Sequence, residues 1–194
     1  MTTTGRTPYT ILGCLTVEPM SGYDIKQFVD DCISHFWSES YGQIYPTLAR
    51  LEEDGLIEGR TEPGERGRDK RVYRITDAGR EELEGWLREP AEPGNARYEH
   101  SLKLFFGYNA DPATSLGHIR DLRERTKEAL ADYEESEARL REQAAADPDA
   151  RAHHWLIVLR GGIRYSRMVL EWCDESEAAL QELRTASAGG EVQA

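Results

Sequence analysis

The sequence contains few of the residues that build metal sites and disulfide frameworks. It has only three cysteines in 194 residues, Cys14, Cys32 and Cys173, and no CxxC pair. Three thiols so far apart do not make a disulfide framework or a zinc site. His153 and His154 are adjacent, so on a helix they point about 100° apart and do not form an i, i+4 metal pair. We expect no metal ion and three buried thiols.

Motifs of the common enzyme and membrane classes are also missing. The sequence has no GxSxG, P-loop or GxGxxG run, and its carboxylate pairs, such as Glu52 and Glu53, fall in charged helical segments. There is no stretch of 18 apolar residues and no basic start followed by a hydrophobic segment. We therefore expect a cytoplasmic protein that is not an enzyme and needs no cofactor.

Positive charge is scarce but unevenly distributed. The chain has 24 Lys and Arg against 36 Asp and Glu, for a net charge of −12, and such an acidic body repels phosphates. Between Arg60 and Arg74, however, six basic residues face three acidic ones, a local charge of +3. Arginine can fork onto phosphate oxygens or a guanine edge. The alternative is an ordinary solvated surface hairpin.

The segment from Ser40 to Gly55 has the spacing of a helix with one buried face. Its apolar side is Ile44, Leu48 and Leu51, and its free side is Gln43, Thr47, Arg50, Glu53 and Asp54. Ser40 followed by Gln43 fits a capping box, and Gly55 is a natural stop. Pro46 removes a backbone donor, so we expect a kink or a helix that begins later.

A short hairpin is predicted directly after this helix. Residues 71–76 alternate with the period of a strand, and the partner strand is predicted over Ile57–Thr61. Two apolar segments, 9–17 and 21–33, precede the polar-faced helix, and their apolar side chains, Tyr23 among them, are expected to pack beneath it. Helix, helix, helix, hairpin is the order of winged helix-turn-helix domains, whose third helix enters the major groove.

The same stretch resembles a known family. YTILGCLTVEPMSGYDI, YGQIYPTLARLEEDGLI and RVYRITDAGREEL, with Trp86, are similar to the PadR family of transcriptional regulators over about residues 8–88. The helical remainder is similar in size and layout to the longer subfamily, whose C-terminal domain is related to virulence activators. The resemblance implies a homodimer that binds an inverted-repeat DNA operator, usually represses and often responds to a small aromatic molecule.

Pattern and resemblance together give the predicted DNA contacts. The helix contacts would address bases or nearby phosphates, and the basic hairpin residues would anchor the wing. In the helix they are Ser40, Tyr41, Gln43, Tyr45, Pro46, Thr47 and Arg50; in the hairpin they are Arg66, Arg68, Lys70, Arg71 and Tyr73.

The second half of the chain is predicted to be helical and to form the dimer. Its last long helix, residues 151–184, has two apolar rows, and two faces need two partners. The first row, expected to pack on the preceding helix, is Leu156, Leu159, Ile163, Leu170, Cys173, Leu180 and Leu183. The second, expected to pack on a symmetry mate, is Trp155, Val158, Gly162, Tyr165, Val169 and Trp172.

Five aromatic residues are candidate walls for a flat effector, because aromatic faces stack and bury a large area. They are Phe36, Trp37, Trp155, Tyr165 and Trp172. Ordinary core packing is the alternative for each of them.

The predicted fold is therefore mainly α. Residues 1–88 form a winged helix-turn-helix with a two-stranded wing, and residues 89–194 form a long-helix dimerisation and effector domain. The favoured function is a homodimeric repressor that a small effector releases from DNA. The alternative is a winged-helix interaction or assembly module whose hairpin binds an acidic protein and not a specific DNA sequence.

Overall fold

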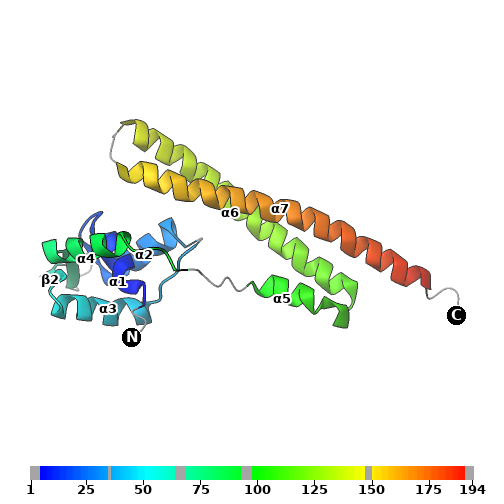
Figure 1. The fold of residues 1–194 in the computed structure, drawn as a ribbon, viewed down its shortest axis with the longest axis horizontal. Coiled ribbons are helices and arrows are strands. Elements are labelled where there is room, and N and C mark those ends of the chain that lie inside the picture. Colours follow the sequence, from blue (N-terminus) through cyan, green and yellow to red (C-terminus); the bar gives the residue numbers. More distant parts are fainter. Residues whose placement is uncertain (1–4, 35, 64–68, 93–97, 147–149, 191–194) are drawn as a thin grey trace. The chain divides into compact units, whose positions relative to one another are not determined.

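The computed structural model describes residues 5–34, 36–63, 69–92, 98–146 and 150–190 (Figure 1). The chain divides into two compact units, Met1–Pro93 and Gly94–Ala194. The sequence had placed this division after residue 88. Each unit is described by itself.

In the described residues of the first unit, four helices pack around one apolar core. They are α1 (Thr7–Leu15), α2 (Gly22–Cys32), α3 (Tyr41–Glu53) and α4 (Asp77–Leu87). Ser21 and Asp24 form a reciprocal capping box at the start of α2, and Thr76 accepts a hydrogen bond from the Gly79 amide at the start of α4. The fully buried residues of this core come mainly from the first three helices, and Ile57 comes from a strand. They are Ile11, Leu12, Ile25, Val29, Ile44, Leu48, Leu51 and Ile57.

Helix α3 begins at Tyr41, so Pro46 lies inside it. The expectation that the helix begins later is wrong, because Ser40 and Gln43 form the capping box that starts it at Tyr41. Pro46 cannot donate to the carbonyl of Gly42, four residues earlier. The predicted stop is confirmed, since Gly55 has φ +71°, a conformation that favours glycine.

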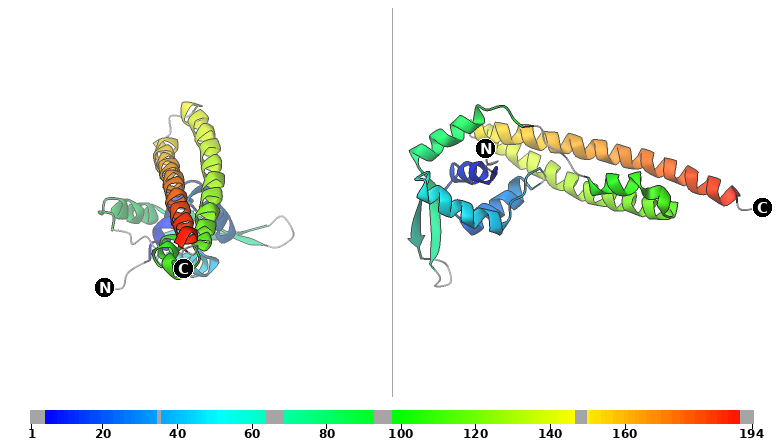
Figure 2. Two further views of the ribbon diagram at one scale, coloured as in Figure 1. Left: turned by 90° about the vertical axis from the view of Figure 1, so that its right-hand side faces the viewer. Right: turned by 60° about the horizontal axis from the view of Figure 1, so that its bottom comes forward.

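A three-stranded antiparallel sheet completes the first unit. Its strands are β1 (Met20–Ser21), β2 (Ile57–Glu62) and β3 (Lys70–Ile75), in the order β1-β3-β2. Ile57 pairs with Ile75 and Glu62 with Lys70, so β2 and β3 form the predicted hairpin, seen in Figure 2. The predicted two-stranded wing is confirmed, and the sheet gains a third strand that was not expected, β1, which pairs with Tyr73 and Val72 of β3. Two residues are too short to show a strand period.

The second unit is built on a helical hairpin. Its elements are α5 (Glu99–Phe105), the short 3₁₀ helix η1 (Gly107–Asn109), α6 (Pro112–Ala146) and α7 (Ala150–Gly190). Helices α6 and α7 run antiparallel, because Arg160 pairs with Glu137 while Arg123 pairs with Glu177 (Figures 1 and 2). Leu156, Leu159, Ile163 and Cys173 of the predicted inner row are buried, whereas Leu183 is exposed.

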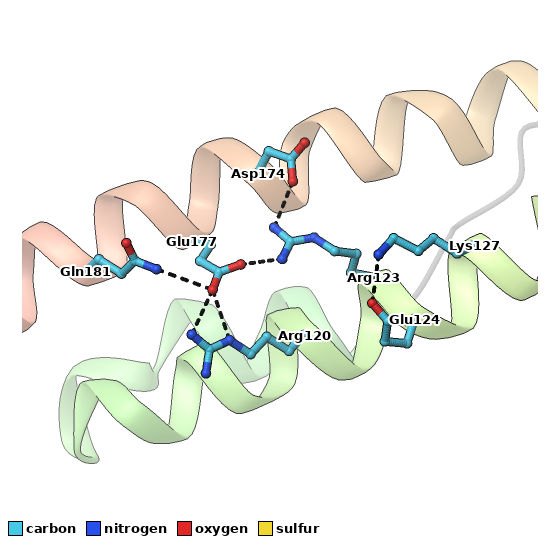
Figure 3. A network of polar contacts seen from close by, with 7 residues as sticks. All are labelled: Arg120, Arg123, Glu124, Lys127, Asp174, Glu177 and Gln181. Atoms are coloured by element: carbon cyan, nitrogen blue, oxygen red, sulfur yellow. Dashed lines mark hydrogen bonds and ion pairs between the residues drawn. The ribbon is translucent and has the colours of Figure 1, made fainter.

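An ionic network fixes α6 against α7 near the open end of the hairpin (Figure 3). The guanidinium of Arg123 contacts Asp174 at 2.8 Å and also pairs with Glu177. Arg120 donates from Nε to the same glutamate at 2.9 Å. Arg123 and Arg120 hold the pKa of Glu177 below its usual range, so the network is intact at neutral pH and weakens as pH falls through that depressed pKa.

The three thiols differ in environment. Cys14 and Cys173 are buried, and burial raises the pKa of Cys14 to about 12. Cys32 is exposed, which corrects the expectation that all three are buried. Within the described residues, no three His, Cys, Asp or Glu side chains gather as they would around a metal ion. In the same part of the chain no helix combines the length and apolarity needed to cross a bilayer.

We predict that Leu48→Ala lowers the free energy of unfolding of the first unit by about 2–5 kcal/mol, because Leu48 is fully buried on the inner face of α3. Arg50→Ala, two residues along the same helix and exposed, should change it by less than about 0.5 kcal/mol. Urea unfolding followed by circular dichroism measures both. Equal losses would contradict the assignment of the buried face.

Candidate nucleic-acid interface

The outer face of α3 carries most of the predicted helix contacts. Tyr41 and Tyr45 are 44% and 51% exposed, and Gln43, Pro46 and Arg50 are exposed beside them. Thr47 is half-buried, and its hydroxyl donates to the backbone carbonyl of Gln43 at 2.7 Å. The outer face is therefore exposed to solvent, but the Thr47 hydroxyl is already engaged in a hydrogen bond within the helix.

Gln43 has a structural role as well as an exposed position. Its Oε1 accepts from the backbone nitrogen of Ser40 at 3.1 Å and from the Ser40 hydroxyl at 2.8 Å. The amide oxygen thus holds the start of α3, while the amide NH2 group is the part of Gln43 that can address a base. Ser40 is likewise engaged in the cap.

Two α2 residues that the sequence did not assign to DNA extend this face. The rings of Tyr23, Tyr41 and Tyr45 form a stacked row, with centroids 6.5 and 6.1 Å apart, and Lys26 Nζ lies 5.8 Å from the centroid of Tyr41. Tyr23 is 54% exposed, so its expected place in the core is wrong. Tyr23 lies about 200° around the helix from buried Ile25. This spacing, visible in the sequence, places Tyr23 on the exposed face of α2.

Every wing cation in strand β3 lies beside a carboxylate. Lys70 Nζ is 3.4 Å from Asp24, Arg71 Nη2 is 2.6 Å from Glu52, and Arg74 Nε is 4.0 Å from Glu58. The two other predicted wing anchors, Arg66 and Arg68, lie outside the described residues.

Two groups in these contacts have shifted pKa values, namely Asp24 and Arg71. Burial opposes ionisation of Asp24, but hydrogen bonds from Ser21 and the neighbouring Lys70 outweigh it and lower its pKa. The hydrogen bond and charge of Glu52 raise the pKa of Arg71. Both shifts favour the charged forms of Asp24 and Arg71. Because each cation of β3 lies beside a carboxylate, the formal charges at the base of the wing nearly cancel.

Tyr73 does not belong to the outer surface. It is buried in the core of the first unit, on the central strand of the sheet, and burial is the largest cause of its raised pKa. Its assignment to DNA contact is corrected for this reason. The alternating pattern of β3 predicts one buried and one exposed face. In the structure Val72 and Tyr73, which point to opposite faces, are both buried.

Within the second unit, the structure does not bring Trp155 and Trp172 together. Trp155 and Trp172 are 17 positions apart on α7, about 25 Å along the axis. Phe36 and Trp37 belong to the other unit, where Trp37 Nε1 donates to Glu39 at 2.9 Å.

A different aromatic group forms within the second unit. Tyr98 lies 6.5 Å from Tyr165, and His100 lies 5.9 Å from Trp172, between ring centroids. Burial and the hydrogen bond with Tyr98 raise the pKa of Tyr165 to about 12, and burial lowers that of His100. The predicted set does not include Tyr98 and His100, because they lie 67 and 72 residues before their ring partners Tyr165 and Trp172.

The outward row of α7 also differs from the predicted one. Val158 and Tyr165 are exposed, but Val169 is 8% exposed and packs on Ile119 and Cys173 inside the hairpin. Its place in the outward row is therefore wrong. Exposed Met168 replaces it, and Gly161 lies closer to the centre of that face than Gly162. The outward row is Val158, Gly161, Tyr165, Met168 and Trp172, of which Trp172 is half-buried.

A three-helix core, a wing beside an exposed helix face and a long helical hairpin define the class of winged-helix transcription regulators with a helical second domain. Residues 11–85 match the transcriptional regulator PadR-like family, and residues 96–181 match the virulence activator alpha C-terminal family. The chain belongs to the PadR-like family of transcriptional regulators.

Two curated relatives match nearly their whole length. The probable transcriptional regulator Rv1176c of Mycobacterium tuberculosis is 35% identical over 190 residues, which cover 91% of this chain and 98% of that protein. The negative transcriptional regulator PadR of Bacillus subtilis is 33% identical over 179 residues, which cover 90% and 97%.

Solved structures give the same grouping. Bacillus subtilis PadR in complex with operator DNA has a TM-score of 0.75 at 29% identity, over 89% of this chain and 98% of that one. The same protein in complex with p-coumaric acid gives 0.71 at 27%, over 91% and 99%. The Vibrio cholerae virulence activator AphA gives 0.70 at 28%, over 91% and 99%.

We predict that Gln43→Glu and Gln43→Ala separate capping from DNA binding. Glutamate keeps an acceptor at this position, so stability should change by less than about 0.5 kcal/mol, but its charge should weaken DNA binding. Alanine should lose about 0.5–1 kcal/mol and mainly reduce discrimination between operator and random DNA. Urea unfolding and fluorescence anisotropy measure the two effects. Equal destabilisation by both changes would contradict the capping role.

Proposed function

We propose that the chain is a homodimeric repressor that binds an inverted-repeat operator and is released by a small aromatic effector. The observation that carries the proposal is the exposed polar face of α3 beside a wing. The names of the relatives support it, since they include a negative transcriptional regulator, a complex with operator DNA and a complex with p-coumaric acid. Such a repressor acts in the cytoplasm.

In this proposal α3 lies in the major groove. Gln43 and Arg50 offer amide and guanidinium donors to base edges, and Tyr41, Tyr45 and Tyr23 offer hydroxyls to the phosphates at the groove edge. Arg66 and Arg68 of the wing, with Lys70, contact the backbone or minor groove. Lys26 adds a further positive charge beside Tyr41. Ser40 belongs to the cap that starts α3, and Pro46 lies exposed within the helix on the same outer face.

The homodimer is proposed to form through the second unit. Its outward row of α7 is apolar, and α5 with η1 exposes more large apolar side chains, namely Leu102, Phe105, Phe106 and Tyr108. An apolar surface of this kind is typical of a protein interface. Two copies joined there would supply two reading helices, which must lie about 34 Å apart to enter successive major grooves.

An effector acts in this scheme only through a difference in affinity. It must bind the DNA-incompetent dimer more tightly than the DNA-competent one, because equal binding shifts no equilibrium. The proposed walls within the second unit are Tyr165 and Trp172, together with Tyr98 and His100. Trp155 lies away from this group along α7, and Phe36 and Trp37 belong to the first unit, so these three predicted walls are not part of it. A planar phenolic molecule has the shape and chemistry for these rings.

We predict that the purified protein binds a fragment of its own promoter, or a site selected from random DNA, in preference to competitor DNA. Affinity should fall steeply between 50 and 200 mM salt, by counterion release, with one dimer per inverted repeat. Electrophoretic mobility shift and fluorescence anisotropy measure this. No preference in either DNA pool would instead favour the interaction-module function, because the net charge of −12 disfavours binding to DNA.

We predict that Val158→Asp converts the dimer to monomer, raising the dimer dissociation constant by about 100-fold or more, because an unpaired carboxylate in an apolar interface costs several kcal/mol. Ala178→Asp is the matched control, since it adds the same charge on an exposed position about 160° around α7. Sedimentation velocity measures both. A Val158→Asp protein that stays dimeric would place the interface elsewhere.

A further inference from the structure

Glu52, in the last turn of α3, connects the reading helix to both long strands of the wing. Its Oε1 accepts from the backbone nitrogen of Gly59 in β2 at 3.0 Å and from Nη2 of Arg71 in β3 at 2.6 Å. One carboxylate oxygen therefore joins three consecutive elements, α3, β2 and β3. Charge-assisted hydrogen bonds of this kind are short and directional.

The packing around Gly59 shows how tightly this junction is built. A Cβ at Gly59 would lie 2.7 Å from Arg71 Nε, 2.7 Å from Glu52 Oε1 and 2.9 Å from Tyr73 Cε1. Only glycine leaves room there for the arginine to lie flat across β2. The guanidinium carbon also lies 5.8 Å from the centroid of the Tyr73 ring. Arg71 is thus held back along the sheet towards α3.

We propose that Glu52 is a positioning residue that withholds Arg71 from DNA phosphates and fixes the wing relative to the reading helix. The inference rests on the proposed DNA interface and deepens it. Because the Gly59 amide also holds the carboxylate, Glu52 keeps its place if Arg71 turns away. A phosphate that approaches Arg71 therefore meets a fixed negative charge.

The consequence is weaker binding to DNA of any sequence and better discrimination between operator and random DNA. A free arginine in the wing adds one phosphate contact on any DNA sequence, and each such contact steepens the slope of log affinity against log salt by about 0.9. Such contacts position a protein without reading bases. Neutralising Arg71 lowers binding to random DNA, while the braced wing keeps α3 in the orientation that reads the operator.

The test compares Glu52→Gln with Glu53→Gln. The first keeps an amide oxygen for the Gly59 N–H but removes the charge that holds Arg71. The second makes the same change in net charge at the neighbouring residue, which is exposed. For Glu52→Gln we expect random-DNA affinity at low salt to rise about 3- to 10-fold, the salt slope to steepen by about 0.9, and the ratio of operator to random affinity to fall at least 3-fold.

Glu53→Gln should change affinity for both DNAs by one common factor and leave the slope nearly unaltered. Adding Arg71→Gln to Glu52→Gln should return the salt slope to that of the unaltered protein. A Glu52→Gln protein that behaves like Glu53→Gln, or whose steeper slope survives the second substitution, would overturn the masking of Arg71.

A second readout needs no DNA. Phenylglyoxal modifies accessible arginines, and mass spectrometry of the wing peptide follows Arg71. We expect modification of the free protein to be at least 3-fold faster in Glu52→Gln than in the unaltered protein or Glu53→Gln, with unchanged circular dichroism. Equal rates in all three would overturn the proposal even if operator binding is found. Faster modification in a protein without operator preference would support the masking and separate it from failure of the proposed function.

Discussion

The exposed face of α3 depends on the removal of its other face from water. Ile44 and Leu48 are fully buried, and each such side chain contributes about 1.5–3 kcal/mol when it leaves solvent. The same core includes Ile57 and Ile75, which pair at the base of the wing. One packed cluster therefore sets both the helix and the hairpin that are proposed to meet DNA.

Charge imposes a second constraint, since the whole chain is acidic and the proposed partner is more so. The positive charge of the wing offsets this repulsion only in part, because the cations of its described strands lie beside Asp24, Glu52 and Glu58. Ion pairs at a surface add little stability, so their effect is better understood as control of charge. Because the charges at the base of the wing nearly cancel, DNA binding depends more on shape complementarity and base contacts than on general electrostatic attraction.

Much of the first unit could be predicted because its signals are local. The capping pair Ser40 and Gln43, the stop at Gly55 and the alternating strand are each encoded within a few residues. The rest depends on contacts between distant segments. Strand β1 exists only because it pairs with β3, and the partners of Lys70 and Arg71 lie 46 and 19 residues away.

Side-chain direction on α7 was the hardest feature to predict, because both of its faces are apolar. The buried residues Leu156, Leu159, Ile163, Ser166, Leu170 and Cys173 follow a spacing of three and four, with Leu170 half-buried, and so does the outward row from Val158 to Trp172. Both rows thus have a seven-residue repeat. A repeat of seven is shorter than two full helical turns, so each seam drives a left-handed supercoil. In the proposed dimer α7 would therefore be shared by two seams of one hand, and a rotation of α7 that alters its fit on α6 would turn the outward seam by the same angle.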